Sequence, residues 1–191
     1  PELVEMLNKE MAGLALPPPP RISVPAGGGI AFEIPTGDAA NPDSAKEVVG
    51  VIIYHHSVNR WYATSMEDAG DDKTPDCWSA DGLLGKERSG HVKHCESCPL
   101  NAWGSGEGGR GKACANRHRL YVLTERSPVP FVIELPPTSV KALSPYIYYL
   151  VMVRGRPSWS LVTKITLKKV QSKDNVTYSE MQFAYMGNLE T

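Results

Sequence analysis

The sequence predicts a mainly β protein: an OB-like barrel with one packed helix and an inserted zinc-binding subdomain. Segments rich in β-branched and aromatic residues recur along most of the chain after residue 29. One run, 75–118, has few apolar residues, many glycines and all four cysteines. A single internal helix-like segment, 137–153, precedes two long strand-like segments. The order of strands, insertion, strands, helix and two strands suits a small β-barrel or a strongly curved sheet, and an OB-type barrel is the leading candidate.

The first 28 residues are typical of an arm outside this domain. Residues 2–16 place Leu3, Leu7, Met11 and Leu14 near helical spacing, which predicts a short amphipathic helix. "PPPP" at 17–20 ends that helix and forms a stiff spacer. We therefore divide the chain into an arm, 1–28, and an OB-like domain, 29–186, with its insertion at 75–118. The arm either docks on a neighbour or remains a frayed tail.

Strands are expected wherever apolar and β-branched residues alternate between turn signals. The expected strands are 30–35, 46–56, 59–65, 119–125, 130–135, 160–170 and 177–187. We expect 46–56 and 59–65 to pair as a hairpin, and the last two strands to be joined by a turn at 173–175. In the helix at 137–153, Thr138 or Ser139 is the expected N-cap, and Pro145 should break or kink it.

The cysteine spacing indicates a structural zinc site. Cys77, Cys95, Cys98 and Cys114 follow the pattern C-x17-C-x2-C-x15-C. Zinc takes four soft ligands in a tetrahedron, and a Cys-x-x-Cys turn supplies two of them from one tight knuckle. The surrounding segment has little to bury, so metal binding would supply the folding free energy that a core normally gives.

Other uses of these cysteines fit less well. Two disulfides would suit a secreted protein, and a redox Cys-x-x-Cys would leave two cysteines unexplained. His91 and His94 flank the pair, and either one replaces a thiolate or lies on the surface near the metal. Deaminase chemistry needs H-x-E together with P-C-x-x-C, but no proline precedes Cys95. Four thiolates would also leave no open coordination position for a reacting water.

The glycine-rich loop does not predict a nucleotide site. "GEGGRGKA" at 106–113 matches the spacing of a phosphate-binding loop, but Ala113 stands where Ser or Thr would hold magnesium. The loop also lacks a preceding strand and runs into Cys114. Its glycines instead let the chain travel between Cys98 and Cys114, so we expect no nucleotide cofactor.

The charges are segregated along a chain whose formal net charge is only −1. Residues 86–119 hold seven basic residues against three acidic ones, and 139–185 hold seven against two. The acidic residues gather in the Gly/Asp-rich stretch 67–81. A near-neutral total can therefore conceal a basic face of the kind that polyanions bind; the alternative is that these cations are scattered over a solvated surface.

Rings and cations lie side by side in "NRWY" and "RHRLY", which is the pattern of single-strand binding surfaces. Each ring has the alternative of packing in the core. The candidate residues for nucleic-acid contact are Tyr54, Arg60, Trp61, Tyr62, Trp103, Arg110, Lys112, Arg117, Arg119, Tyr121, Arg154, Arg156, Trp159, Lys164 and Lys168.

Several motifs together, "CWSADG", "CPLNAWGS" and "GKAC" above all, resemble those of phage- and prophage-encoded zinc-containing single-stranded DNA-binding proteins. The resemblance spans roughly residues 48–186. It implies an OB barrel of the helix-destabilising type with zinc at the four cysteines. It also implies accessory work in DNA replication or recombination, with replication or recombination proteins as further partners.

The leading hypothesis is a sequence-tolerant single-stranded DNA-binding protein that carries out no catalysis. The rival is an adaptor whose zinc knuckle docks on a polymerase or transcription complex. A nuclease would need clustered carboxylates on rigid elements, and the acidic stretch 67–81 is a loop. No run approaches the ~20 apolar residues of a membrane span, and no signal peptide is visible. We therefore expect no membrane partner and a location in the cytoplasm, that of the host cell for a phage-encoded protein.

Overall fold

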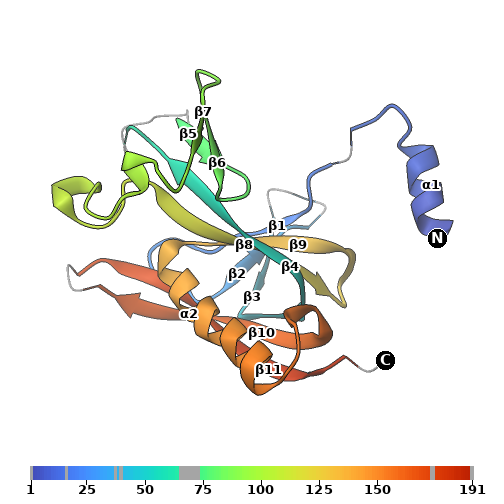
Figure 1. Cartoon of the computed structure of the whole chain (residues 1–191). Coiled ribbons are helices and arrows are strands. Elements are labelled where there is room, and N and C mark those ends of the chain that lie inside the picture. The colour runs from blue at the N-terminus through green and yellow to red at the C-terminus, as the bar shows by residue number, and fades with distance from the viewer. Residues whose placement is uncertain are drawn as a thin grey trace.

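The computed structural model describes residues 2–15, 17–36, 38, 41–64, 74–172 and 175–189, without the side chains of Leu3 and Val4 (Figure 1). Residues 67–73 of the acidic stretch and residues 173–174 of the predicted turn lie outside these residues. The described chain is mainly β. Its elements are α1 (Glu2–Glu10), β1 (Arg21–Ile22), β2 (Phe32–Ile34), β3 (Asp43–Ala45), β4 (Glu47–Trp61), β5 (Cys77–Ser79), β6 (Leu84–Glu87), β7 (Val92–His94), η1 (Pro99–Asn101), η2 (Glu107–Gly109), β8 (Ala115–Thr124), β9 (Ser127–Leu135), α2 (Pro137–Tyr148), η3 (Tyr149–Val153), η4 (Ser158–Ser160), β10 (Leu161–Gln171) and β11 (Thr177–Asn188).

Strand β4 organises the molecule, because it pairs with three partners in succession. Its first residues pair with β10, its middle with β8, and its end, 59–61, with β5, all antiparallel. Strand β9 extends the sheet beyond β8, and β11 pairs with β10. The predicted hairpin between 46–56 and 59–65 is therefore wrong. "HSVN" at 56–59 contains no glycine or proline and no Asn-Gly or Asp-Gly pair of the kind that two-residue hairpin turns favour, and the strand continues through it.

The sheet is curved but does not close into a barrel. No backbone ladder joins β9 to β11 within the described ranges. Strand β1 pairs in parallel with β9, and Ser179 Oγ donates to the carbonyl oxygens of Pro25 and Gly29 at 3.1 and 2.7 Å. The Met181 N–H donates to Ser139 Oγ of α2 at 3.0 Å. The Ser139 hydroxyl thus satisfies one backbone N–H on the free edge of β11, and Ser179 ties that edge to the segment at Pro25–Gly29. In a closed barrel, β9 would pair with this edge.

The core lies between the inner face of the sheet and α2. Its fully buried members include Ile52, Leu120, Ile133, Ile165 and Met181. Helix α2 contributes three buried side chains to the same cluster: Leu143, Tyr146 and, just beyond its end, Leu150. The alternation that buries these residues points their neighbours on β4, β8 and β9 outward.

Helix α2 differs from its prediction at both ends. Its N-cap is Pro136, with Pro137 in the first turn, where a missing N–H costs no helical hydrogen bond. Ser139 is buried and bonds β11, so neither Thr138 nor Ser139 caps the helix. Pro145 lies inside α2 without ending it, and a π-helical turn, Tyr149–Val153, follows.

The insertion is more regular than its composition suggests. Strands β5, β6 and β7 form a small antiparallel sheet that continues from the end of β4. Strand β8 begins at Ala115, inside the predicted insertion 75–118. The insertion is therefore an outgrowth of the main sheet, and it projects above it in Figure 1.

Helix α1 is shorter than predicted and stands apart from the sheet (Figure 1). Within the described chain, the hydrogen bonds that leave Glu2–Glu10 reach only Met11 and Ala12 of the turn that follows it. None of the helices in the described ranges is long and apolar enough to cross a membrane.

Candidate functional site

Alternation brings rings and cations from three strands to one outer face of the sheet. On β4, Tyr54, His56 and Arg60 lie on the side opposite the core. The register pairs Tyr54 with Tyr121 and His56 with Arg119 across to β8. The next register step pairs Arg119 with Glu134 of β9. We call this surface the outer β face.

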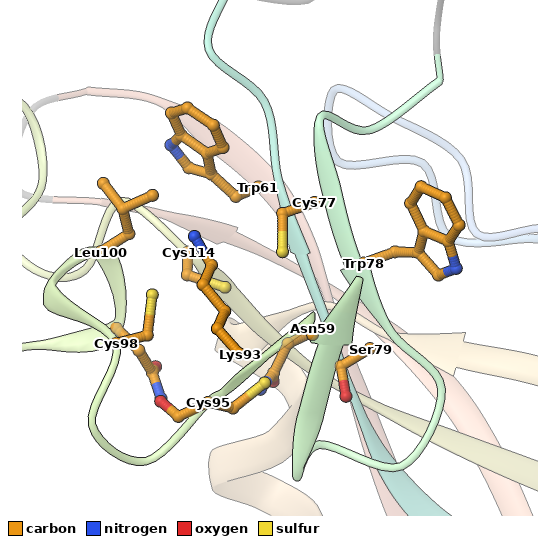
Figure 2. Close-up of a pocket in the computed structure, with 12 residues that line it drawn as sticks. Asn59, Trp61, Cys77, Trp78, Ser79, Lys93, Cys95, Cys98, Leu100 and Cys114 are labelled. Carbon is orange, nitrogen blue, oxygen red and sulfur yellow. The ribbon is translucent and has the colours of Figure 1, made fainter. Parts of the chain in front are cut away.

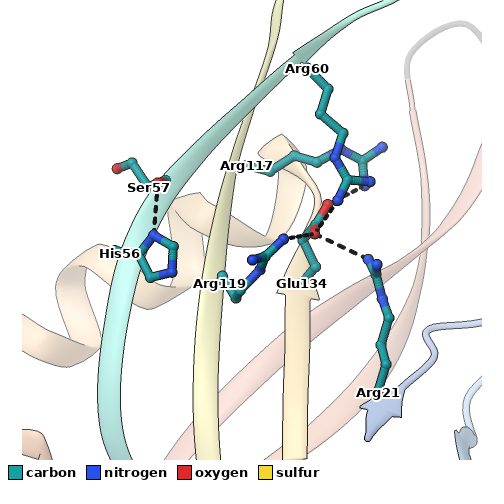
Figure 3. A network of polar contacts seen from close by, with 7 residues as sticks. All are labelled: Arg21, His56, Ser57, Arg60, Arg117, Arg119 and Glu134. Carbon is teal, nitrogen blue, oxygen red and sulfur yellow. Dashed lines mark hydrogen bonds and ion pairs between the residues drawn. The ribbon is translucent and has the colours of Figure 1, made fainter. Parts of the chain in front are cut away.

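Four arginines surround one buried carboxylate on this face (Figure 3). The side chain of Glu134 is 0 % exposed. Its Oε2 lies 2.7 Å from Arg60 Nη2, 3.2 Å from Arg21 Nη2 and 3.3 Å from Arg119 Nη2. Arg117 Nη1 lies 3.7 Å from the other oxygen, Oε1. The four guanidinium groups therefore converge from β1, β4 and β8 on a single point of β9.

The cluster carries more positive charge than its carboxylate neutralises. Four guanidinium groups against one carboxylate leave a formal charge of +3. The Nε atoms of Arg117 and Arg119 are buried without a hydrogen-bond partner, and so is Glu134 Oε1. At 3.7 Å, Arg117 forms an ion pair with Oε1 that is too long for a hydrogen bond. Positioned donors with excess charge are suited to receive a further anion, and arginine matches phosphate especially well.

Three rings form a platform next to the arginines. The ring centroids of Tyr54 and His56 lie 5.4 Å apart, those of Tyr54 and Tyr121 5.7 Å, and those of His56 and Tyr121 5.8 Å. His56 Nδ1 lies 3.1 Å from the Ser57 carbonyl oxygen, which fixes its ring (Figure 3). Tyr54 remains 59 % exposed, so the platform offers a ring face to a flat ligand.

Two open grooves meet at the arginine cluster. The first, of about 760 Å³, is lined by Arg60 and Arg119 on the sheet and by Tyr62 and Trp78 beyond it. The second, of about 880 Å³, is lined by Arg21, Arg117 and Glu134 together with Tyr178 of β11. A track therefore runs from the insertion, across the arginines, to the start of β11.

The remaining predicted nucleic-acid residues do not join this track. Trp61 points to the other side of β4 and lines the cysteine cavity. Trp103, Arg110 and Lys112 lie on the loop of the insertion, where Lys112 Nζ donates to Asn101 Oδ1 at 3.2 Å. The others lie on or next to α2 and β10: Arg154, Arg156, Trp159, Lys164 and Lys168.

Sequence reasoning missed Arg21, His56, Trp78, Tyr178 and Glu134. Arg21 follows the Pro-rich spacer, and nothing local connects it to β9. Glu134 had a usable signal, because it is a lone acid within the apolar strand "FVIEL". A carboxylate on a strand with buried neighbours needs cationic partners.

All four cysteines line one small cavity at the base of the insertion (Figure 2). Cys77 begins β5, Cys95 and Cys98 form the turn after β7, and Cys114 directly precedes β8. The cavity measures about 10 Å³, the space of a single water molecule or ion. Trp61 closes it on one side, whereas the indole of Trp78 points away from the thiols (Figure 2).

The thiols lie close enough to influence one another. Burial, and then the neighbouring cysteines, raise the pKa of Cys114 to about 11. Burial also raises the pKa of Cys77. A Cβ added at Gly85 would lie 3.1 Å from Cys77 Sγ and 3.5 Å from Cys95 Sγ, so only glycine leaves this side of the cavity free.

The cavity is lined by the four thiols that a zinc site needs, but these thiols are not placed at the distances of a metal-bound site. Four thiols around an ion-sized space are the donor set of a structural zinc centre. However, no three Cys, His, Asp or Glu side chains of the described residues are placed as a group that would hold a metal ion. His91 and His94 are exposed and do not line the cavity. The sulfur atoms would have to draw together around an ion.

No protein-family model, curated protein or solved structure matches this chain. Membership of the zinc-containing single-stranded DNA-binding proteins, which the motifs suggest, therefore stays a prediction. The geometry of the outer β face and of the thiol cavity carries the functional interpretation.

Proposed function

We propose that the chain is a sequence-tolerant single-stranded DNA-binding protein of phage-type replication or recombination. DNA lies along the outer β face, between the insertion and the start of β11. The protein coats the strand and assists other replication or recombination proteins, without a catalytic step of its own.

The observation that supports this best is the arginine cluster around Glu134. Its formal excess of three positive charges lies between two grooves and beside the platform of Tyr54, His56 and Tyr121. Single-strand binding needs both parts, since cations neutralise phosphates while rings stack on bases at about 1–3 kcal/mol each. Stacking favours no particular base, and a duplex keeps its bases stacked on one another.

The order of the strands supports an OB-like architecture. The sequence β9, β8, β4, β10, β11 across the sheet is that of a five-stranded Greek-key barrel that is partly open. In such barrels the second and third strands, with the loops after the first and fourth, bind oligonucleotides. Here the second and third strands are β8 and β9, and the loop after the first strand is the insertion; these parts border the proposed DNA track.

We also propose a structural zinc ion held by Cys77, Cys95, Cys98 and Cys114. The ion would fix three segments of the insertion at one point, and a closed set of four thiolates leaves no position for a reacting ligand. Its role is therefore to hold the insertion, and with it Trp78, against the end of β4.

A charge-matched pair of variants tests the DNA proposal. Arg119→Gln removes a cation from the cluster, whereas Arg126→Gln removes one that pairs with Asp43 at 2.8 Å outside the track. Titration of labelled oligo(dT) by fluorescence anisotropy should show about tenfold weaker binding for Arg119→Gln. The slope of log K against log salt should fall by about 0.7.

Arg126→Gln should bind like the wild type. Equal affinity and equal salt slope for all three folded proteins would remove the outer β face as the DNA site. Circular dichroism shows that the compared variants remain folded.

A further inference from the structure

The C-terminal end of α2 exposes an apolar surface that the DNA track does not use. Tyr148, Val151, Met152 and Val153 are between 51 % and 68 % exposed, on consecutive turns of α2 and η3. We call these four residues the α2 ridge. Exposed apolar residues that gather in one place mark interaction sites more often than isolated ones do.

Cations border the ridge. Arg154 and Arg156 follow it directly, and the Arg154 guanidinium lies 4.2 Å from the centre of the Tyr185 ring. No acidic residue lies between 135 and 173. The ridge is therefore matched to a partner with an apolar stripe and negative charge.

Helix α1 and the turn that follows it have both properties. Leu7, Met11 and Leu14 recur at the spacing of one helical face, and Leu7 and Leu14 are 48 % and 66 % exposed. Glu2, Glu5 and Glu10 outnumber Lys9. A helix of nine residues is marginal without a packing partner. Among the described residues, this one makes no hydrogen bond or ion pair beyond the turn that follows it.

The spacer directs this arm outward. The Pro20 carbonyl oxygen accepts a hydrogen bond from the Val132 N–H at 2.8 Å, which fixes the spacer at the edge of β9. The prolines before it form an extended segment of about 3.1 Å per residue. Figure 1 shows α1 at the end of this segment, away from α2. The arm is therefore better placed to reach the α2 ridge of a neighbouring molecule than the α2 ridge of its own chain.

We propose that the arm of one copy docks on the α2 ridge of a second copy. The apolar stripe of Leu7, Met11 and Leu14 packs on Tyr148, Val151, Met152 and Val153, and the glutamates face Arg154 and Arg156. Because arm and ridge are different surfaces, the contact is head-to-tail and repeats into open chains. It needs no DNA.

Two complementary variants test the contact on the full chain without DNA. Leu7→Glu disables the arm, and Met152→Glu disables the ridge. By sedimentation velocity, the wild type should grow in mass with concentration, and each variant alone should remain monomeric. An equal mixture should give dimers and nothing larger, since one intact arm then meets one intact ridge.

Leu83→Glu is the matched control, because Leu83 is an exposed apolar residue of the insertion, 68 % exposed. It should assemble like the wild type. A monomeric wild type at the highest concentration reached, or a mixture that stays monomeric, would overturn the proposal. So would a Met152→Glu protein that assembles normally but loses affinity for oligo(dT), because the ridge would then belong to the DNA surface.

Discussion

At the scale of single residues, Glu134 determines how the arginine cluster is held. Without a central acceptor, Arg21, Arg60 and Arg119 would repel one another and turn toward solvent. With it, their guanidinium groups are fixed before any ligand arrives, which reduces the conformational entropy that binding must remove. The same carboxylate opposes a phosphate, so it stabilises the protein while limiting its affinity for DNA.

Replacing Glu134 should separate these two effects. Glu134→Gln keeps the shape and one acceptor oxygen but raises the formal charge of the cluster from +3 to +4. We expect the free energy of unfolding to fall by about 2 kcal/mol, because the arginines lose a buried counter-charge. Affinity for oligo(dT) should rise several-fold at low salt.

Glu47→Gln is the control for net charge, since Glu47 is exposed and lies 3.9 Å from Lys164 outside the cluster. Glu47→Gln should change neither the free energy of unfolding nor the affinity for oligo(dT) appreciably. Urea unfolding measures the first quantity, and fluorescence anisotropy measures the second. If the folded Glu134→Gln protein bound DNA more weakly, the carboxylate would act mainly by positioning the arginines, and it would not limit the affinity for DNA.

At the scale of elements, the insertion is joined to the sheet by the thiol cavity and by a chain of amides. Asn116 Nδ2 donates to Asn59 Oδ1 and to Asn101 Oδ1, both at 2.9 Å. Asn101 Nδ2 donates in turn to the Cys95 carbonyl oxygen at 2.8 Å. Trp78 directly follows Cys77, so order at the thiols extends to the groove beside Arg60.

Removing one thiol should therefore loosen both the metal site and the groove. If the proposed zinc ion is present, Cys98→Ser should lose it and unfold the insertion, because metal binding would supply the insertion's folding free energy. Metal content per chain and hydrogen exchange over 75–118 measure this. Ser97→Ala changes the neighbouring exposed side chain and should retain the wild-type values. A Cys98→Ser protein with full metal content and unchanged protection would exclude a zinc centre at these cysteines.

At the scale of the whole molecule, the sequence predicts the strands well and their partners poorly. Strands β9, β10 and β11 lie within a few residues of the predicted segments, because side-chain alternation is a local property. The continuous strand β4 was divided into a hairpin, and the order of elements did not decide between a closed barrel and a curved sheet with an open edge between β9 and β11. Both depend on long-range pairing.

The candidate site shows the same limit. Arg60, Arg117 and Arg119 were recognisable from neighbouring rings, and the cysteines from their spacing. Their convergence on Glu134 depends on the register of three strands, with Arg21 contributed by the segment after the spacer. Contacts across more than a hundred residues, such as Arg21 with Glu134 at 3.2 Å, leave no pattern in a single sequence.

The most direct test of the central claim is the anisotropy of labelled oligo(dT) against the wild-type chain. It should be measured at low and at physiological salt, with a duplex of equal length as the control. The proposed DNA track predicts tight binding to the single strand, weak binding to the duplex and a steep loss of affinity with salt. No binding to the single strand at low salt would contradict the function proposed here, and the insertion would then be better explained as a docking surface for another protein.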